Sequence, residues 1–204
     1  DFTNESCIQA CEAHPEKPEF EVLEDVVAKA AELIAEGNPI GWFQGRMEFG
    51  PRALGGRSIL GRADQRGIAD KINSPIKFRE RWRPFCPSVL DSIAEEVIES
   101  DHQADFMTIT FNVADEWKEK MPEVVHKDGS ARVQVVHAET NPKYHSLLTK
   151  LQGMTGNGVV LNTSLNRRGE PMVCSPRDAL EMFFGSDLQY MVLEDLLVTK
   201  HRES

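Results

Sequence analysis

The amino-acid sequence predicts an α/β fold in which helices pack on one twisted β-sheet. Short apolar runs of strand length alternate along the chain with longer stretches whose apolar residues recur at helical spacing. Clusters of glycine, proline and asparagine separate these segments. The sequence contains neither an internal repeat nor a low-complexity tract. With 204 residues, the chain suits one domain with a sizeable core, alone or with a small appendage.

The first half of the chain opens on a segment without a clear apolar pattern. Residues 1–20 are polar and contain two prolines, so we expect a linker or N-terminal arm before a domain spanning residues 21–204. A helical stripe over Val22–Glu36 and a strand over Ile40–Gln44 then lead into a long glycine-rich loop at 45–63. Further expected elements are a helix at Asp64–Asn73, a strand at Phe85–Leu90, a helix at Ser92–Glu99, and strands at Phe106–Val113 and Arg132–Ala138.

Capping residues define the helices in the second half of the chain. Asn141-Pro142 predicts the start of a helix that runs to about Met154, and a strand at Gly158–Leu161 follows. Ser175 as N-cap and Pro176 at the first helical position predict another helix, which ends near Gly185. Strands are expected at Leu188–Leu193 and Leu196–Thr199.

Charge is unevenly distributed along the chain. The net charge is -10, yet the stretch from Arg46 to Arg83 holds eight Arg and two Lys against four acidic residues, a local charge of +6. The remainder therefore carries -16. An acidic protein with one basic stretch is a poor general nucleic-acid binder, so we expect no nucleic-acid partner. The pattern favours a pocket for a small anion.

The sequence also bears on location. No apolar run approaches the ~20 residues that span a bilayer, and the acidic, polar start does not resemble a signal peptide, so we expect no membrane partner. The chain begins with Asp rather than Met, and we interpret it as a piece of a longer protein. The four cysteines form no C-x-x-C pair, so reduced thiols in the cytoplasm are expected.

A first candidate for chemistry is the glycine-rich stretch GRMEFGPRALGGRSILG at 45–61. It combines five glycines with Arg46, Arg52 and Arg57. Glycine-rich backbone presents N–H groups to anions, and arginine binds phosphate oxygens in pairs. No G-K-[ST] follows, so this is not a Walker A loop. The alternative is a surface loop whose arginines pair with acidic residues elsewhere.

A second candidate is the basic run IKFRERWRPFCP at 76–87. Lys77, Arg79, Arg81 and Arg83 alternate, so in an extended segment all four side chains point to one side. Four neighbouring cations repel one another unless an anion or buried acids meet them. The alternative is a solvated edge strand, in which charges prevent aggregation.

A third candidate is the run LNTSLNRRGEP at 161–171, which follows an apolar strand. Ser164 and Asn166 are two residues apart and can share a face. The run offers hydroxyls and amides but neither a general base nor an activated nucleophile. The alternative is a turn that happens to be polar.

Three stretches together, FGPRALGGRSIL, INSPIKFRERWRPFCPSVL and LNTSLNRRGEPMVCSPRDAL, closely resemble the C-terminal domain of the O-carbamoyltransferases of nodulation-factor and antibiotic biosynthesis. The resemblance runs from about Val22 to Lys200. That domain is similar to the YrdC/Sua5 fold, which implies a twisted mixed sheet with helices packed on it. The K-x-R element of that fold matches 77–79, its S-x-N element matches 164–166, and its G-E-P run matches 169–171.

The resemblance also implies an activity. The family's C-terminal domain uses ATP and carbamoyl phosphate to make carbamoyladenylate. An N-terminal Kae1-like domain, which holds a metal through histidines, then transfers the carbamoyl group to an acceptor hydroxyl. The six histidines of this chain are scattered, and we assign none to a metal. The chain is thus expected to carry the adenylate-forming half of the reaction, with the Kae1-like domain as its partner.

Roles for individual residues follow from the same resemblance. Lys77 and Arg79 are expected to bind phosphates of ATP or the adenylate, and Arg52 and Arg57 to grip carbamoyl phosphate. Mg²⁺ is expected to arrive with ATP and to be held mainly by its phosphates. Ser164 and Asn166 are expected to hydrogen-bond the α-phosphate or ribose, with a secondary role for Arg81, Arg83 and Asn162.

Three alternatives remain. A YrdC-like domain could bind RNA, with a steep salt dependence. The chain could be a non-catalytic module that docks on the transfer domain, in which case ligands would leave its melting temperature unchanged. It could also make threonylcarbamoyladenylate, although the GPRALG loop fits the carbamoyltransferases better. The expected site makes one geometric demand: Lys77 and Ser164 must converge on one anion site.

Overall fold

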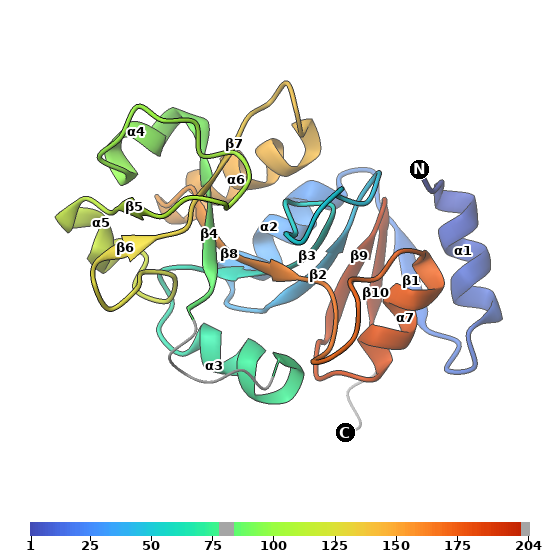
Figure 1. Cartoon of the computed structure of the whole chain (residues 1–204). Coiled ribbons are helices and arrows are strands. Elements are labelled where there is room, and N and C mark those ends of the chain that lie inside the picture. The colour runs from blue at the N-terminus through green and yellow to red at the C-terminus, as the bar shows by residue number, and fades with distance from the viewer. Residues whose placement is uncertain (78–83, 201–204) are drawn as a thin grey trace.

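The computed structural model describes residues 1–77 and 84–200. Its centre is an eight-stranded mixed sheet with the order β1-β10-β9-β2-β3-β8-β4-β7 (Figure 1). Neighbouring strands are antiparallel except for β2 with β9 and β4 with β7, which are parallel. The predicted α/β class with one mixed sheet is confirmed. The strands are β1 (Glu19–Val22), β2 (Ile40–Phe43), β3 (Arg57–Arg62), β4 (Cys86–Leu90), β7 (Gln134–Val136), β8 (Val159–Ser164), β9 (Tyr190–Leu193) and β10 (Leu196–Thr199).

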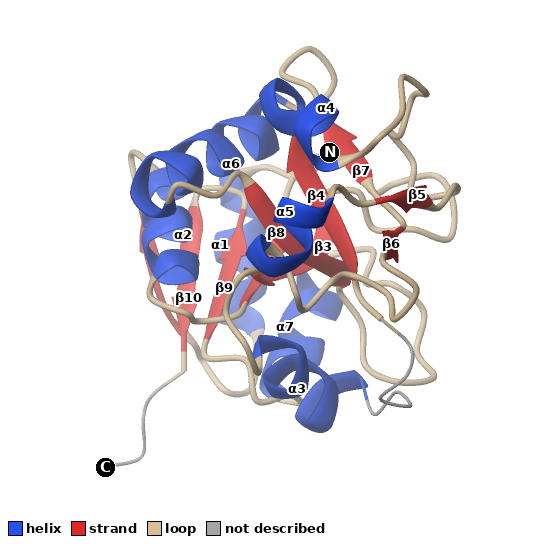
Figure 2. Ribbon diagram, turned by 90° about the vertical axis from the view of Figure 1, so that its left-hand side faces the viewer, coloured by secondary structure: helices blue, strands red, loops and turns tan. Residues whose placement is uncertain are grey.

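Helices cover this sheet, and two of them begin and end where the sequence predicts. In Figure 2, the helices lie around the strands rather than in a separate layer of their own. Asn141 caps α6 by accepting from the Tyr144 N–H, and Ser175 caps α7 in a capping box with Asp178. The helices are α1 (Asn4–Ala13), α2 (Val26–Ala35), α3 (Ile68–Ile72), α4 (Ala94–Val97), α5 (Asp115–Lys120), α6 (Pro142–Thr155) and α7 (Pro176–Phe184), and short β5 (Phe111–Asn112) pairs with β6 (Ser130–Ala131).

The N-terminal segment differs from the predicted linker or arm. Thr3 and Ser6 form a capping box that starts helix α1, which packs on α7 (Figure 1). The sequence pattern hid this helix because its fully buried residues are two cysteines, Cys7 and Cys11, with only Ile8 and Ala10 as partly buried apolar neighbours. Strand β1 then pairs with β10, so this segment packs with the rest of the chain. The predicted boundary at residue 20 stays a prediction.

Helix α2 and the predicted strand at Phe106–Val113 also differ from prediction, each for a local reason. Helix α2 begins at Val26 rather than at residue 22, because Asp25 caps it and the preceding residues pair as β1. The predicted strand at Phe106–Val113 shrinks to β5, because Met107 has a positive φ of 51° that interrupts extended backbone.

Strand β3 lies inside the stretch predicted as a loop. It occupies a central place between β2 and β8, where both neighbours supply a hydrogen-bonded ladder. Gly61 suggested a loop, but here it permits close packing, since a Cβ would lie 3.0 Å from Cγ1 of Ile68 in α3. The core around it is built from large buried side chains such as Trp42, Phe43 and Ile59. Within the described residues, no helix combines the length and apolar character needed to cross a membrane.

Candidate active site

The end of strand β8 carries the polar run singled out in the sequence. β8 pairs with β3 on one side and β4 on the other, and its register sets Asn162 opposite Leu60 and Cys86. Beyond Ser164 the chain leaves the sheet, and the Leu165 N–H donates to the Arg57 carbonyl at 2.9 Å. The polar residues therefore lie at the end of a central strand, where the sheet gives way to loops.

Lys77 reaches this strand end from a distant part of the chain. Its side chain is 3% exposed, and its Nζ donates to four oxygens of the S-x-N run. The carbonyl and hydroxyl oxygens of Ser164 lie 2.6 and 3.2 Å from Nζ. The carbonyl and side-chain oxygens of Asn166 lie 2.9 and 2.6 Å away. The expected convergence of residues far apart in sequence is confirmed.

This arrangement shows that Lys77 stabilises the end of strand β8. An ammonium has three donors, and four oxygens around it compensate its burial. The Ser164 hydroxyl in turn donates to Asn166 Oδ1 at 2.6 Å, and Asn166 Nδ2 donates to the Glu170 carbonyl at 2.7 Å. Lys77 thus fixes the shape and the positive charge of the strand end, while its expected contact with a phosphate stays a prediction.

A small pocket opens beside this cluster. Its volume is about 70 Å³, roughly the space of two water molecules at about 30 Å³ each. Among its lining residues Arg52 and Arg132 carry the charge, and none is a carboxylate. Arg132 Nη2 donates to Cys86 Sγ at 3.1 Å, and Arg132 Nε is buried without a hydrogen-bond partner among the described residues. Such a lining suits a small anion. The pocket is lined by Pro51, Arg52, Ala53, Cys86, Met107, Arg132, Asn162, Thr163 and Ser164.

Asn162 lies at the base of this pocket and ties it to the sheet. It is 2% exposed, and its Nδ2 donates to Ser88 Oγ at 2.9 Å, to the Ala53 carbonyl at 3.1 Å and to Gln134 Oε1 at 3.3 Å. Its side chain therefore holds the backbone next to Arg52. The predicted direct contact with a ligand is untested, and the observed contacts make Asn162 a support for the pocket wall.

The guanidinium of Arg57 is buried in the core, and its predicted contact with carbamoyl phosphate stays a prediction. The residue is 1% exposed, and its guanidinium donates to the carbonyls of Gln44, Gly56 and Gly45 at 3.0 Å and of Cys174 at 3.4 Å. Its Cζ also lies 3.5 Å from the centre of the Phe43 ring. Burial lowers the pKa of Arg57. These contacts give it a structural role, and it does not line the small pocket.

The comparisons with known proteins now decide the family. Residues 31–200 match the profile of the family described as carbamoyltransferase C-terminus. This chain belongs to that family. The carbamoyltransferase C-terminal domain is 42% identical over 191 residues to the nodulation protein NolNO of Sinorhizobium fredii, covering 91% of this chain and 28% of that protein. It is 40% identical over 184 residues to NolO of Bradyrhizobium diazoefficiens, covering 89% and 34%. The chain therefore spans about a third of the length of these relatives.

Solved structures resemble the domain in fold. HypF from T. kodakarensis matches with a TM-score of 0.61 and 16% identity over 97% of this chain and 26% of that chain. HypF in a phosphate- and nucleotide-bound form matches with a TM-score of 0.58 and 15% identity, covering 88% and 22%. A variant of P. abyssi Sua5 matches with a TM-score of 0.52 and 13% identity, covering 82% and 50%. The YrdC-like fold of this carbamoyltransferase domain is confirmed.

Several predicted residues of the carbamoyltransferase domain lie outside the described part of the chain. Arg79, Arg81 and Arg83 belong to 78–83, so their predicted roles and the predicted extended alternation stay predictions. Lys77 itself closes a π-helical turn, Asn73–Lys77, instead of starting an extended segment.

Arg132 is the pocket residue that the sequence did not identify. It precedes the short edge strand β7 and belongs to no recognisable motif, so neither spacing nor composition singles it out. The one available signal is a lone cation at the start of an otherwise apolar β-rich run. Its contribution depends on the parallel pairing of β7 with β4, which brings Arg132 to Cys86.

The remaining titratable groups bear on metal binding and on thiol chemistry. Within the described residues, no group of three His, Cys, Asp or Glu side chains could hold a metal ion. The four cysteines are free thiols, and burial raises the pKa of Cys7 to about 11 and of Cys11 to about 12. Such thiols stay protonated near neutral pH and are poor nucleophiles.

Proposed function

We propose that this carbamoyltransferase C-terminal domain binds ATP and carbamoyl phosphate and forms carbamoyladenylate. The observation that carries the proposal is the Lys77–Ser164–Asn166 cluster beside an arginine-lined pocket of about 70 Å³. A site with cations, hydroxyls and amides but no carboxylate suits phosphoryl and carbamoyl oxygens. The family membership and the YrdC-like fold support the same activity.

The proposed chemistry matches the size and charge of the pocket. Water cleaves the C–O bond of carbamoyl phosphate to release phosphate and carbamate. A carbamate oxygen attacks the α-phosphorus of ATP, and the bond to the β-phosphate breaks to release pyrophosphate. The pocket has room for the small carbamoyl or phosphoryl end, and the rest of the nucleotide lies outside it.

Positioning and charge neutralisation are what the residues of this chain supply. Arg52 and Arg132 offset negative charge on the reacting oxygens, and the Ser164 hydroxyl hydrogen-bonds a phosphate oxygen. No protein nucleophile is needed, because water is the nucleophile of the first step and carbamate that of the second. Lys77 acts through the strand end that it holds, by fixing Ser164 and Asn166 in place.

Mg²⁺ enters the proposal only as a companion of ATP. The small pocket has no carboxylate in its lining, so its residues do not fit a protein-held magnesium site. The phosphates of ATP are the ligands that remain for the ion, and no step here depends on a metal held by the chain.

A second part of the longer protein completes the proposed reaction. The relatives are about three times as long as this chain, which leaves room for a further domain. We infer that a Kae1-like domain N-terminal to this one transfers the carbamoyl group from the adenylate to an acceptor hydroxyl. We infer that the reaction takes place in the cytoplasm, where ATP is available.

Ligand binding and pyrophosphate release test the proposal. ATP with Mg²⁺ and carbamoyl phosphate should each raise the melting temperature of the chain, since both bind the folded state. Pyrophosphate release should depend on carbamoyl phosphate and should be lost in Arg52→Ala and Ser164→Ala. Arg177→Ala, at an exposed arginine of α7, is the matched control. If neither ligand moves the melting temperature, the proposal is wrong and a docking module is favoured.

A further inference from the structure

The loop that carries Arg52 folds around a single carboxylate. Oε1 of Glu48 accepts from the backbone N–H groups of Leu54 and Gly56, both at 2.7 Å, and of Arg57 at 3.1 Å. These donors lie six to nine positions further along the chain. One side-chain oxygen thus closes the loop between strands β2 and β3.

Three converging backbone N–H groups form the kind of concave donor set that binds anions in proteins. Here a carboxylate of the same chain fills it. The turn depends on Gly55, which has a φ of 98°, and a Cβ at that position would collide with the Tyr144 ring. Glu48 Oε2 is buried without a hydrogen-bond partner among the described residues. Oε1 therefore accepts three hydrogen bonds, whereas Oε2 of the same carboxylate accepts none from the described residues.

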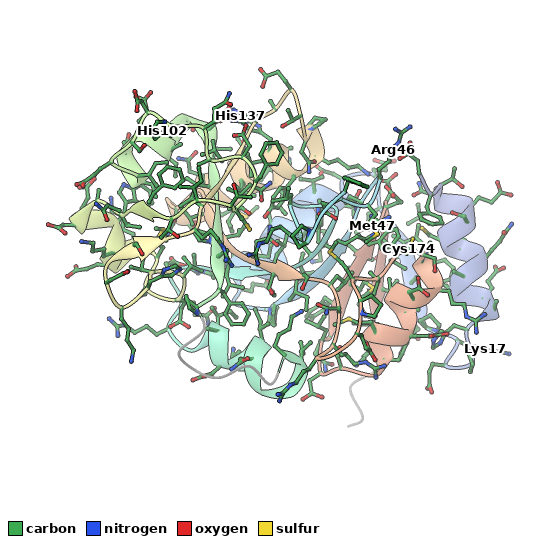
Figure 3. The ribbon with its side chains drawn as sticks, in the orientation of Figure 1. Lys17, Arg46, Met47, His102, His137 and Cys174 are labelled. Carbon is green, nitrogen blue, oxygen red and sulfur yellow. The ribbon has the colours of Figure 1, made fainter. Side chains whose placement is uncertain are left out.

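The carbonyl side of the same loop is held by the sheet. The Ala53 carbonyl accepts from Asn162 Nδ2 at 3.1 Å, and the Leu54 carbonyl accepts from Gln134 Nε2 at 2.9 Å. Glu48 therefore accepts from the backbone N–H groups of this segment, and side chains of the sheet donate to its backbone carbonyls. The earlier part of the loop is exposed: Arg46 lies at the edge of the fold in Figure 3, and Met47 and Phe49 are exposed hydrophobic side chains.

Arg52 lies immediately before this segment, which Glu48 and the sheet both bind, and it lines the small pocket. We propose that Glu48 is a positioning residue for that pocket: its carboxylate sets the backbone at 54–57 and thereby the place of Arg52. The inference rests on the proposed function, because it assumes that Arg52 grips the anionic substrate. Glu48 itself does not line the pocket and touches no substrate in this proposal.

The test measures carbamoyl phosphate binding by calorimetry on the whole chain. Glu48→Ala removes the acceptor of three N–H groups and should weaken binding by about tenfold or more. Glu48→Gln keeps an oxygen at the same reach and should bind within about threefold of the wild type. Glu48→Asp keeps the charge but loses reach, and should fall between the two. Glu139→Ala, at an exposed glutamate, should bind like the wild type.

Chemical rescue separates positioning from general destabilisation. Added formate can enter the three N–H groups that Glu48→Ala leaves empty, and it should restore much of the lost affinity. The same formate concentration should not strengthen binding to the wild type or to Arg52→Ala. If the alanine variant does not fold, Glu48→Asp carries the same test on the basis of its measured affinity.

Three results would each overturn a statement: two concern the positioning role of Glu48, and one concerns the proposed function. If Arg52→Ala loses carbamoyl phosphate binding while Glu48→Ala and Glu48→Asp bind like the wild type, Glu48 has no positioning role. The same conclusion follows if Glu48→Ala is weakened and formate restores nothing. If Arg52→Ala itself binds like the wild type, the proposed function of the pocket fails, whatever Glu48 does.

Discussion

Lys77 donates to both the side-chain oxygen and the carbonyl oxygen of Asn166, at 2.6 and 2.9 Å, across 89 positions of sequence. The pair joins the end of a π-helical turn to the end of a central strand. It is one of the contacts that bring Lys77 of the K-x-R element to the S-x-N element, and the first prediction concerns its loss.

Lys77→Met should impair both stability and ligand binding. It leaves partly buried oxygens of Ser164 and Asn166 without their donor, and a fully buried group left unsatisfied costs roughly 1–3 kcal/mol, which sets the upper bound here. Urea denaturation should therefore give a lower free energy of unfolding, and calorimetry should detect no ATP binding. Lys29→Met, at an exposed lysine of α2 that pairs with Glu32, should change the unfolding free energy by less than about 0.5 kcal/mol. Unchanged stability and unchanged ATP affinity in Lys77→Met would remove Lys77 from the site.

Much of the fold follows from local signals that survive in the three-dimensional structure. Asn141 and Ser175 cap α6 and α7 as predicted, because a capping side chain acts on its own first turn. Two of the failed predictions have non-local causes, unlike those at helix α2 and at Phe106–Val113. Helix α1 is stabilised by packing on α7, and β3 by ladders with β2 and β8, neither of which leaves a mark in its own sequence.

The residues of the candidate site differ in the same way: some could be predicted from the sequence, and others depend on non-local pairing. Lys77, Ser164 and Asn166 could be predicted to meet because each lies in a motif of a recognisable family. Arg132 could not be, since it enters the pocket only through the pairing of β7 with β4. Arg57 lies in a motif that suggests an anion ligand, but its guanidinium donates to carbonyls in the core, so its predicted grip on carbamoyl phosphate stays a prediction.

Substitution of Arg57 should affect stability more than ligand binding. Arg57→Met removes the donors to the carbonyls of Gln44, Gly45 and Gly56, and we expect the free energy of unfolding to fall by about 2–4 kcal/mol. At a temperature where the variant is folded, its affinity for carbamoyl phosphate should stay within a few-fold of the wild type. Arg46→Met, at an exposed arginine of the same loop, is the control for stability (Figure 3). A folded Arg57→Met that has lost all binding would restore Arg57 as a ligand.

The buried thiols of helix α1 should make stability depend on alkaline pH. Burial raises the pKa of Cys7 to about 11 and of Cys11 to about 12, above their ordinary value of 9.0. The folded state therefore keeps thiol protons that the unfolded state loses above pH 9. The contribution of the two thiols to the free energy of unfolding is thus complete below pH 9 and is lost as pH rises through 11 to 12. Urea denaturation should give a free energy of unfolding that falls over that range. The fall should be smaller in Cys11→Ala, and an equal fall in that variant would contradict the assignment.

Cys86 offers a direct readout of the pocket, because its Sγ accepts from Arg132 there at 3.1 Å. In a Cys174→Ser background, which removes the exposed thiol labelled in Figure 3, slow alkylation by iodoacetamide should report mainly on Cys86. Carbamoyl phosphate should slow this alkylation by filling the pocket, and inorganic phosphate should do so more weakly.

Arg132→Leu removes one of the two charges of the lining, so it should raise the concentration of carbamoyl phosphate needed to protect Cys86 by about tenfold. Cys7 and Cys11 supply the internal reference, since buried thiols of raised pKa should be alkylated equally slowly with and without the ligand. Alkylation of Cys86 at the same rate with and without saturating carbamoyl phosphate would mean that the substrate does not enter this pocket.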